Sequence, residues 1–400
     1  MAGGQSAAAG ISSLLEGKEV LVFCGAGGVG KTSVAASAAL AAASRVNGKV
    51  LVLTIDPARR LADALGLEGA LGNVARRVPA EACAKAGLEL RGELWAAMLD
   101  TKQSWDELVL RHAPDEETAY RILDNRLYHN ITARFVQSHD YIAMERLFDV
   151  HSTGEYDLII IDTPPSRNAI DFLEAPARMA EFFGGRVVRW ITMPYRVGGK
   201  RGARVINIAS RPFYQVADRI LGGELLQDVA EFFLNFQSMY DGFVTRARAV
   251  EALLHDRRTG FVVVTTLESA PLAEAERFCE ELRSRRFGLG ALVCNKTLPE
   301  SLRSADGRRA ADDLTARAPA LAERLAQTGA EAFADPARTA RVLTTVAESF
   351  QNFALVATRE EELRAELASA PEVVVDVPEL SGEVADLEAL VHIADRLAPR

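Results

Sequence analysis

The sequence has few cysteines, no long apolar run and no excess of positive charge. Its four cysteines form no CxxC pair, so we expect a reducing, cytoplasmic setting, with a peripheral place at the membrane as a second option. No window approaches about 18 uninterrupted apolar residues, which argues against a membrane-spanning helix. The polar start lacks a basic segment followed by an apolar core, so we expect no signal peptide and a flexible tail over residues 1–17.

Acidic side chains outnumber basic ones, 55 to 46, and the formal net charge is −9. No global basic field is available for a nucleic-acid backbone, so we expect no nucleic-acid partner. The hydrophobic fraction of 48% and the charged fraction of 25% are those of an ordinary globular chain. This balance excludes intrinsic disorder and a coiled-coil rod.

Short apolar runs bounded by turn residues alternate with helix-length segments. We expect strands at residues 20–24, 50–55, 94–99, 158–161, 261–265, 291–293 and 373–377. Several of these runs are continuously apolar, as in strands that are buried on both faces of a parallel sheet. The alternation predicts a doubly wound α/β fold with a mostly parallel sheet of about seven to eight strands.

Two long stretches, residues 101–154 and 176–257, break this alternation with helical patterning. Such lengths exceed ordinary connections between strands, so we expect residues 18–400 to form one domain with two helical insertions. The second insertion combines aromatic and methionine side chains with a basic cluster at residues 196–211. This composition suits an apolar partner or anionic lipid head groups, although a helical layer with a solvated basic face would look similar.

The first strand runs directly into a glycine-rich loop and a helix. Its residues, Gly25-Ala26-Gly27-Gly28-Val29-Gly30-Lys31-Thr32, fit G-x-x-x-x-G-K-[ST] in the required strand–loop–helix setting. Glycines let successive backbone N–H groups turn around a phosphate chain, and the helix N-terminus adds partial positive charge. We expect Lys31 to reach the β- and γ-phosphates and the Thr32 hydroxyl to ligate Mg²⁺. A dinucleotide-binding turn is the weaker alternative, because it has no need for Lys-Thr after the last glycine.

Two carboxylates follow buried strands. Asp162 ends the apolar run at residues 158–161, which is the form that a Mg²⁺-organising acid takes in these nucleotide hydrolases. Asp56 follows the run at residues 50–55 and reaches the carboxyl edge of the sheet, where ligands of doubly wound folds bind. The alternative for each is an aspartate that only begins a turn.

Three segments together resemble the nucleotide motifs of the ArsA family of ATPases, which includes arsenite-pump ATPases and the guided-entry ATPases that target tail-anchored membrane proteins. They are Gly25–Thr32, Thr54–Arg59 and Asp162–Ser166. Farther on, Leu292–Lys296 resembles the adenine-contacting segment of the family, and Val377–Leu380 resembles its closing loop. The resemblance covers roughly residues 18 to 397, which is nearly the whole chain.

The resemblance implies ATP and Mg²⁺ as cofactors and a role for each matching residue. Asp56, Lys31 and Asp162 would be catalytic, with Asp56 orienting the attacking water, while Thr32 and Asp162 would hold Mg²⁺. Asn295 would read adenine. The residues that would bind ATP are Gly25, Ala26, Gly27, Gly28, Val29, Gly30, Lys31, Thr32, Ser33, Asn295 and Pro378. The resemblance also implies a dimer whose rearrangement on nucleotide binding handles a membrane-protein or other apolar client.

The chain departs from the family pattern at a decisive position, because Ala26 stands where the family has its signature lysine. In relatives that lysine neutralises charge on the nucleotide of the partner subunit. We therefore expect slow hydrolysis by the isolated chain, and either a homodimer or a heterodimer with an ArsA-like paralogue that carries the lysine. Arg59 and Arg167 are the candidates for a local replacement.

A nucleotide-binding regulatory subunit, or pseudo-ATPase, is the alternative function, and a small-molecule kinase is a weaker one. The CxxC of the tail-anchor targeting relatives is absent, so we expect no zinc. The scattered cysteines argue against arsenite transport, because a soft-metal site needs several convergent thiolates.

Overall fold

The computed structural model describes residues 10–55, 60–67, 69, 71–134, 136–163, 174–175, 178, 181, 229, 232–236, 239–367, 371–380, 382, 384 and 386–399. Most of the second expected insertion, residues 176–257, lies outside this set, and so do Asp56, Arg59 and Arg167.

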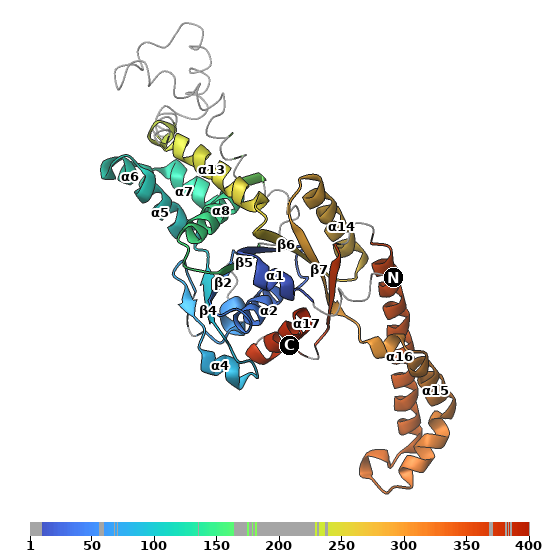
Figure 1. Cartoon of the computed structure of the whole chain (residues 1–400). Coiled ribbons are helices and arrows are strands. Elements are labelled where there is room, and N and C mark those ends of the chain that lie inside the picture. The colour runs from blue at the N-terminus through green and yellow to red at the C-terminus, as the bar shows by residue number, and fades with distance from the viewer. Residues whose placement is uncertain are drawn as a thin grey trace.

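One sheet of eight strands forms the centre of the described chain, in the order β3-β4-β2-β5-β1-β6-β7-β8 (Figure 1). The strands are β1 (Val20–Cys24), β2 (Lys49–Thr54), β3 (Arg76–Arg77), β4 (Glu93–Met98), β5 (Leu158–Asp162), β6 (Thr259–Thr265), β7 (Leu289–Thr297) and β8 (Val373–Pro378). Every neighbouring pair is parallel except β3 and β4. The expected mostly parallel α/β sheet is confirmed, with the short edge strand β3 as an addition.

Both faces of the sheet are covered, which explains the continuous apolar runs. In β1, Val20 and Val22 enter the apolar core on one face, and Leu21 and Phe23 enter the core on the other. Because successive strand side chains point to opposite faces, a strand buried on both sides needs apolar residues throughout.

Helices from different parts of the chain form the two covering layers. On one face lie α1 (Ser12–Gly17), α2 (Lys31–Ala43), α3 (Arg60–Ala64), α4 (Ala80–Lys85) and α17 (Leu387–Leu397). On the other lie α5 (Thr101–His112), α6 (Glu116–Leu123), α7 (Arg126–Arg134), α8 (Val136–Ser152), α13 (Tyr240–His255) and α14 (Ser269–Ser284). The helices α5–α8 occupy the first expected insertion. None of the described helices is long and apolar enough to cross a membrane.

The described part of the expected tail packs against the body of the protein. Ile11 and Leu15 are buried in the core on the α2 face, and the Ile11 N–H donates to the carbonyl of Leu397 at 2.8 Å. The helical spacing of these two apolar side chains gives α1 one face to bury, so residues 10–17 are held at the end of α17 instead of forming a tail.

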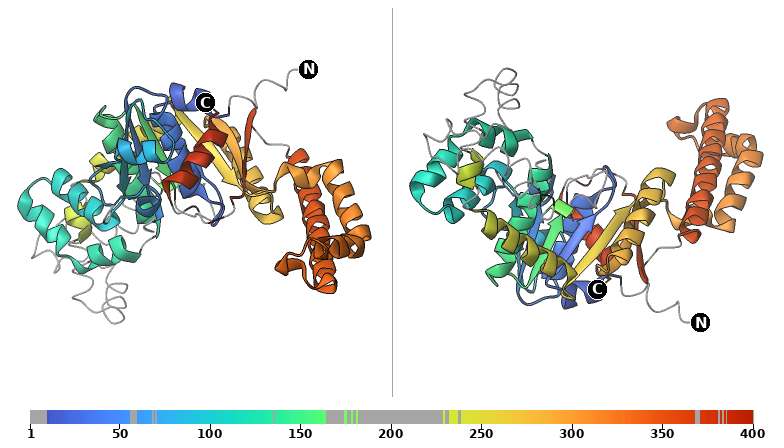
Figure 2. Two further views of the ribbon diagram at one scale, coloured as in Figure 1. Left: turned by 90° about the horizontal axis from the view of Figure 1, so that it is seen from below. Right: turned by 90° about the horizontal axis from the view of Figure 1, so that it is seen from above.

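A helical hairpin between β7 and β8 was not foreseen from the sequence. Its helices are α15 (Ala305–Ala326) and α16 (Pro336–Ala365), and short 3₁₀ turns lie at Glu300–Arg303 and Glu331–Phe333. The buried residues of the two helices are mainly alanines: Ala311, Ala318, Ala322, Ala347, Ala354 and Ala357. The hairpin projects from the sheet on the side away from α5–α8 in every view (Figures 1 and 2).

Candidate nucleotide-binding site

The glycine loop connects the carboxyl end of β1 to the start of α2. Gly30 has φ of 88° and is the N-cap of α2 without a side-chain capping bond, so the positive end of the helix faces the loop. A Cβ on Gly30 would lie 2.3 Å from Nδ2 of Asn295, and a Cβ on Gly25 would lie 2.0 Å from the carbonyl oxygen of Val264. Only glycine fits these two positions, and the tight loop that results is the shape that wraps a phosphate chain.

The Lys31 side chain lies in this loop and is held there by hydrogen bonds to the backbone of the loop. Its side chain is buried, with 6% exposure. Its Nζ donates to the carbonyl oxygens of Gly25 at 2.9 Å and Ala26 at 2.8 Å. The ammonium therefore already lies inside the loop, where a phosphate chain would meet it.

The Thr32 hydroxyl and the Asp162 carboxylate meet as the sequence predicts. Thr32 Oγ1 donates to Asp162 Oδ2 at 2.7 Å, and Asp162 is only 1% exposed. Asp162 reaches this place because β5 pairs with β1, so that it lies opposite Phe23 at the start of the loop. A hydroxyl beside a buried carboxylate is the oxygen donor set that Mg²⁺ prefers, so the residues present fit this ion.

Thr54 belongs to this cluster and was missed as a site residue. Its hydroxyl donates to the same Asp162 oxygen at 2.9 Å, because β2 pairs with β5 and places Thr54 opposite Asp162. The sequence feature that could have indicated Thr54 as a site residue is its place as the first residue of the Thr54–Arg59 motif.

The end of β7 braces the loop from the other side. Asn295 Nδ2 donates to the Val29 carbonyl at 2.8 Å, and Lys296 Nζ lies 3.2 Å from the Gly28 carbonyl, to which it donates. Lys296 adopts φ of 58°, an uncommon conformation for a side-chain-bearing residue, which marks a constrained site. Pro378, on β8, pairs with Thr297 beside these residues.

Ala26, the second residue of the loop, is buried at 8% exposure within the apolar core on the α2 face. Ser33 lies in the first turn of α2 and is half-buried. The structure thus brings Lys31, Thr32 and Asp162 together with Asn295 beside the loop, whereas Asp56, Arg59 and Arg167 lie outside the described residues.

The four cysteines are free and buried. Burial raises the pKa of the Cys294 thiol to about 12 and the pKa values of Cys83 and Cys279 to about 11. Protonated thiols are poor metal ligands. Among the described residues, no group of three or more His, Cys, Asp or Glu side chains could hold a metal ion.

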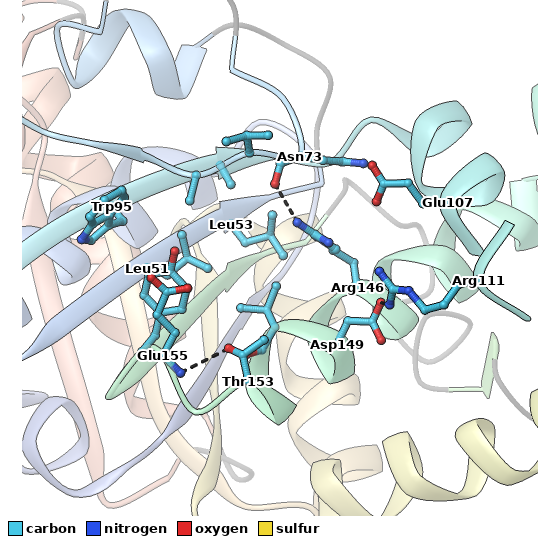
Figure 3. Close-up of a pocket in the computed structure, with 15 residues that line it drawn as sticks. Leu51, Leu53, Asn73, Trp95, Glu107, Arg111, Arg146, Asp149, Thr153 and Glu155 are labelled. Carbon is cyan, nitrogen blue, oxygen red and sulfur yellow. Dashed lines mark hydrogen bonds and ion pairs between the residues drawn. The ribbon is translucent and has the colours of Figure 1, made fainter. Parts of the chain in front are cut away.

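A separate cleft of about 460 Å³ lies between the sheet and the helices α5 and α8 (Figure 3). Leu51, Leu53 and Trp95 line its sheet side. Two guanidinium groups are in the cleft: Arg111 pairs with Asp149 at 2.6 Å, and Arg146 donates to the Asn73 carbonyl at 2.7 Å. These groups are engaged by the protein, and the cleft contains none of the expected nucleotide-binding residues.

Comparison with known proteins agrees with the loop geometry. A family model of the ArsA family, described as anion-transporting ATPase, matches residues 18–318. The chain belongs to the ArsA family of ATPases. It is accordingly an ATP hydrolase, and the expected membership and enzyme class are confirmed. The match ends within α15, so α16, β8 and α17 lie beyond the matched region.

Individual relatives are distant in sequence. The chain is 27% identical over 286 residues to ATPase GET3 of Meyerozyma guilliermondii, which covers 68% of this chain and 71% of that protein. It is 25% identical over 287 residues to putative arsenical pump-driving ATPase 2 of Aquifex aeolicus, covering 70% and 81%. It is 22% identical over 298 residues to putative arsenical pump-driving ATPase 1 of the same organism. This match covers 71% of this chain and 64% of that protein, which is less than two thirds of its length.

Proposed function

We propose that this ArsA-family ATPase binds ATP together with Mg²⁺ at the Gly25–Thr32 loop and uses the energy of hydrolysis to handle an apolar client. The observations that carry the nucleotide part are the contact between Thr32 and Asp162 at 2.7 Å and the ammonium of Lys31, which is buried within the loop. These three groups are the parts that hold phosphates and Mg²⁺ in nucleotide hydrolases with this loop.

Each side chain has a distinct task in this proposal. Lys31 exchanges a backbone carbonyl for a phosphate oxygen, and the Thr32 hydroxyl turns its oxygen toward Mg²⁺ while Asp162 balances the charge. Mg²⁺, when bound, neutralises the negative charge that builds up on the phosphate oxygens. Asp56 orients the attacking water, and Asn295 contacts adenine from the end of β7.

We further propose that the working unit is a dimer that rearranges when nucleotide binds, and that the client is a membrane-protein segment or another apolar chain. Relatives named as GET3 ATPases and arsenical pump-driving ATPases support a nucleotide-driven machine. The aromatic and methionine content of residues 176–257 supports an apolar client.

The alternative is a regulatory subunit that binds nucleotide and serves a catalytic paralogue. Ala26 favours it, because a buried alanine offers no cation to the nucleotide of a partner. Cations supplied in trans contribute about 10³ to 10⁵ in rate in comparable nucleotide hydrolases, so the missing lysine should dominate the kinetics.

Steady-state hydrolysis by the purified chain, with and without an ArsA-like paralogue that carries the lysine, separates these functions. We expect slow turnover alone, marked stimulation by the paralogue, and at least tenfold faster turnover in Ala26→Lys. Ala316→Lys, which adds the same charge on the exposed surface of α15, is the control and should not accelerate hydrolysis.

Fast turnover by the wild-type chain alone, abolished by Arg167→Ala, would show that a homodimer uses a local arginine. ATP binding with no hydrolysis by the isolated chain, as wild type or as Ala26→Lys, and hydrolysis only in the presence of the paralogue would favour the regulatory subunit. Failure to bind ATP would overturn the proposal.

A further inference from the structure

Exposed apolar side chains concentrate on α16, the second helix of the projecting hairpin. Of the eight large hydrophobic residues that are exposed in the described chain, five lie on this helix. They are Val342 at 54%, Val346 at 54%, Phe353 at 54%, Leu355 at 71% and Val356 at 52%. Contiguous exposed apolar surface of this kind marks an interaction site.

Four of these residues form one stripe along the helix. Val342, Val346, Phe353 and Val356 follow a four-and-three spacing in which Ser349 occupies the central position, so all five positions share one side of α16. The stripe lies beside the row of Ala347, Ala354 and Ala357, which is buried in the hairpin. Leu355 lies on another side of the helix, so it does not belong to the stripe.

Two apolar residues of the stripe and two charged residues at its ends are placed symmetrically about Ser349. Val342 and Val356 stand seven residues before and after Ser349, and Arg338 and Glu360 stand eleven residues before and after it. A second copy running antiparallel across Ser349 would place Arg338 beside Glu360 and Val342 against Val356. The small Ser349 would lie at the crossing, where two helices approach most closely.

The charged residues at the two ends of the stripe, Arg338 and Glu360, are placed so that they could pair between two copies. Arg338 is exposed, and among the described residues it forms no ion pair. Glu360 is half-buried, and its Oε2 accepts from the Leu298 N–H at 3.3 Å, which holds the carboxylate at the base of the hairpin. Within the chain, Arg303 lies close enough to act on the Glu360 carboxylate electrostatically, and Arg359 is paired with Glu362 at 2.9 Å. Arg338 of another copy would be a second cation for Glu360.

We propose that the α15–α16 hairpin is a self-association surface, which binds the hairpin of a second copy of this chain in an antiparallel four-helix arrangement. Two helical hairpins that bury an apolar stripe between them form such a bundle, and a twofold interface needs a self-complementary patch. The hairpin projects away from the sheet (Figure 2). At its base, Glu360 accepts from the N–H of Leu298, two residues after Lys296, which contacts the phosphate loop. The proposed interface is formed by α16, whereas a dimer that closes over nucleotide would be formed at the phosphate loop.

Cysteine crosslinking under mild oxidation tests the geometry, since the native cysteines are all buried. Ser349→Cys should form a covalent dimer without nucleotide, and equally in a Lys31→Ala background. Leu355→Cys, exposed on another side of the same helix, is the matched control and should crosslink at least tenfold more slowly. A disulfide needs Cα atoms within about 7 Å, so only the correct crossing permits it.

A mixture of two single variants distinguishes antiparallel from parallel pairing. Val342→Cys chains mixed with Val356→Cys chains should crosslink with each other, and each variant alone should not. Crosslinking of each variant alone would show a parallel pair and overturn the proposal.

Sedimentation of nucleotide-free protein tests the energetics. Phe353→Lys should weaken self-association at least tenfold while the helical content stays unchanged, and Leu355→Lys should weaken it less than twofold. Arg338→Glu should also weaken association, and adding Glu360→Arg should restore it. A monomer at all concentrations, or a Ser349→Cys crosslink that appears only with an added paralogue or apolar peptide, would assign the stripe to another partner and overturn self-association.

Discussion

Replacing Lys31 with alanine should weaken ATP binding by about 10- to 150-fold while the fold persists. The ammonium is buried and donates to two loop carbonyls, at 2.9 Å to Gly25 and 2.8 Å to Ala26. A hydrogen bond from a charged group contributes about 1.5–3 kcal/mol to a complex.

The expected loss corresponds to one such bond and not to two, because the protein without nucleotide already satisfies the ammonium. When ATP binds, Lys31 gives up one neutral carbonyl for a charged phosphate oxygen, so the affinity gained is at most that of one hydrogen bond between charged groups. At about 1.4 kcal/mol per factor of ten, 1.5–3 kcal/mol becomes the range stated above.

Calorimetric titration with ATP and Mg²⁺ measures this change, and thermal unfolding checks that the variant is folded. Lys296→Ala is the matched control, because Lys296 also donates to a loop carbonyl, at 3.2 Å, but is exposed. We expect it to weaken binding less than about threefold, as exposed charges contribute little. Unchanged affinity in Lys31→Ala, or an equal loss in Lys296→Ala, would refute a specific role for the buried ammonium.

Three further outcomes are expected. Asp56→Asn should keep ATP affinity within a few-fold and lower turnover about 10²-fold or more in steady-state assays; joint loss of both would make Asp56 a structural or Mg²⁺-binding residue. Asn295→Ala should weaken ATP more than GTP if the amide reads adenine, whereas equal weakening would mean that it only braces the loop. Alkylation of the native protein at pH 8 should be slow at Cys83, Cys279 and Cys294, because burial raises each thiol pKa to about 11 or 12. An acid whose folded pKa is raised binds more protons when folded, so these thiols should also lower stability as pH rises from about 9 toward 12.

The phosphate loop could be predicted from sequence because its chemistry is local. Gly25 to Thr32 carries the turn, the ammonium and the hydroxyl in eight consecutive residues after an apolar strand. Thr54 could not be found in this way, because its partner Asp162 lies 108 residues away and only the pairing of β2 with β5 brings them together.

The hairpin is hard to predict from sequence because its fully buried residues are mostly small. Apolar periodicity normally indicates the buried face of a helix. In α16 the row of Ala347, Ala354 and Ala357 is buried, whereas the larger Val342 and Phe353 are exposed. Reading periodicity alone would therefore bury the side of α16 that the structure leaves exposed.

Strand β7 connects the phosphate loop to the α15–α16 hairpin. Asn295 and Lys296 at the end of this strand contact the carbonyls of Val29 and Gly28 in the phosphate loop. The turn that opens the hairpin, Glu300–Arg303, follows a few residues later. We predict that a change in the loop on ATP binding is passed through β7 to the hairpin, so that ATP alters hairpin self-association.

Thermodynamic linkage between ATP binding and self-association allows this last prediction to be tested in two independent ways. If ATP changes the association constant by a given factor, association must change the ATP affinity by the same factor, and coupling of about 1–3 kcal/mol is typical between such sites. Sedimentation with and without ATP measures the change in the association constant. Titration with ATP of the wild type and, separately, of Phe353→Lys measures the change in ATP affinity. Asn295→Ala should reduce both together, since it removes the contact between β7 and the loop. Equal association with and without ATP would show that the hairpin and the nucleotide site act independently, even if both proposals hold separately.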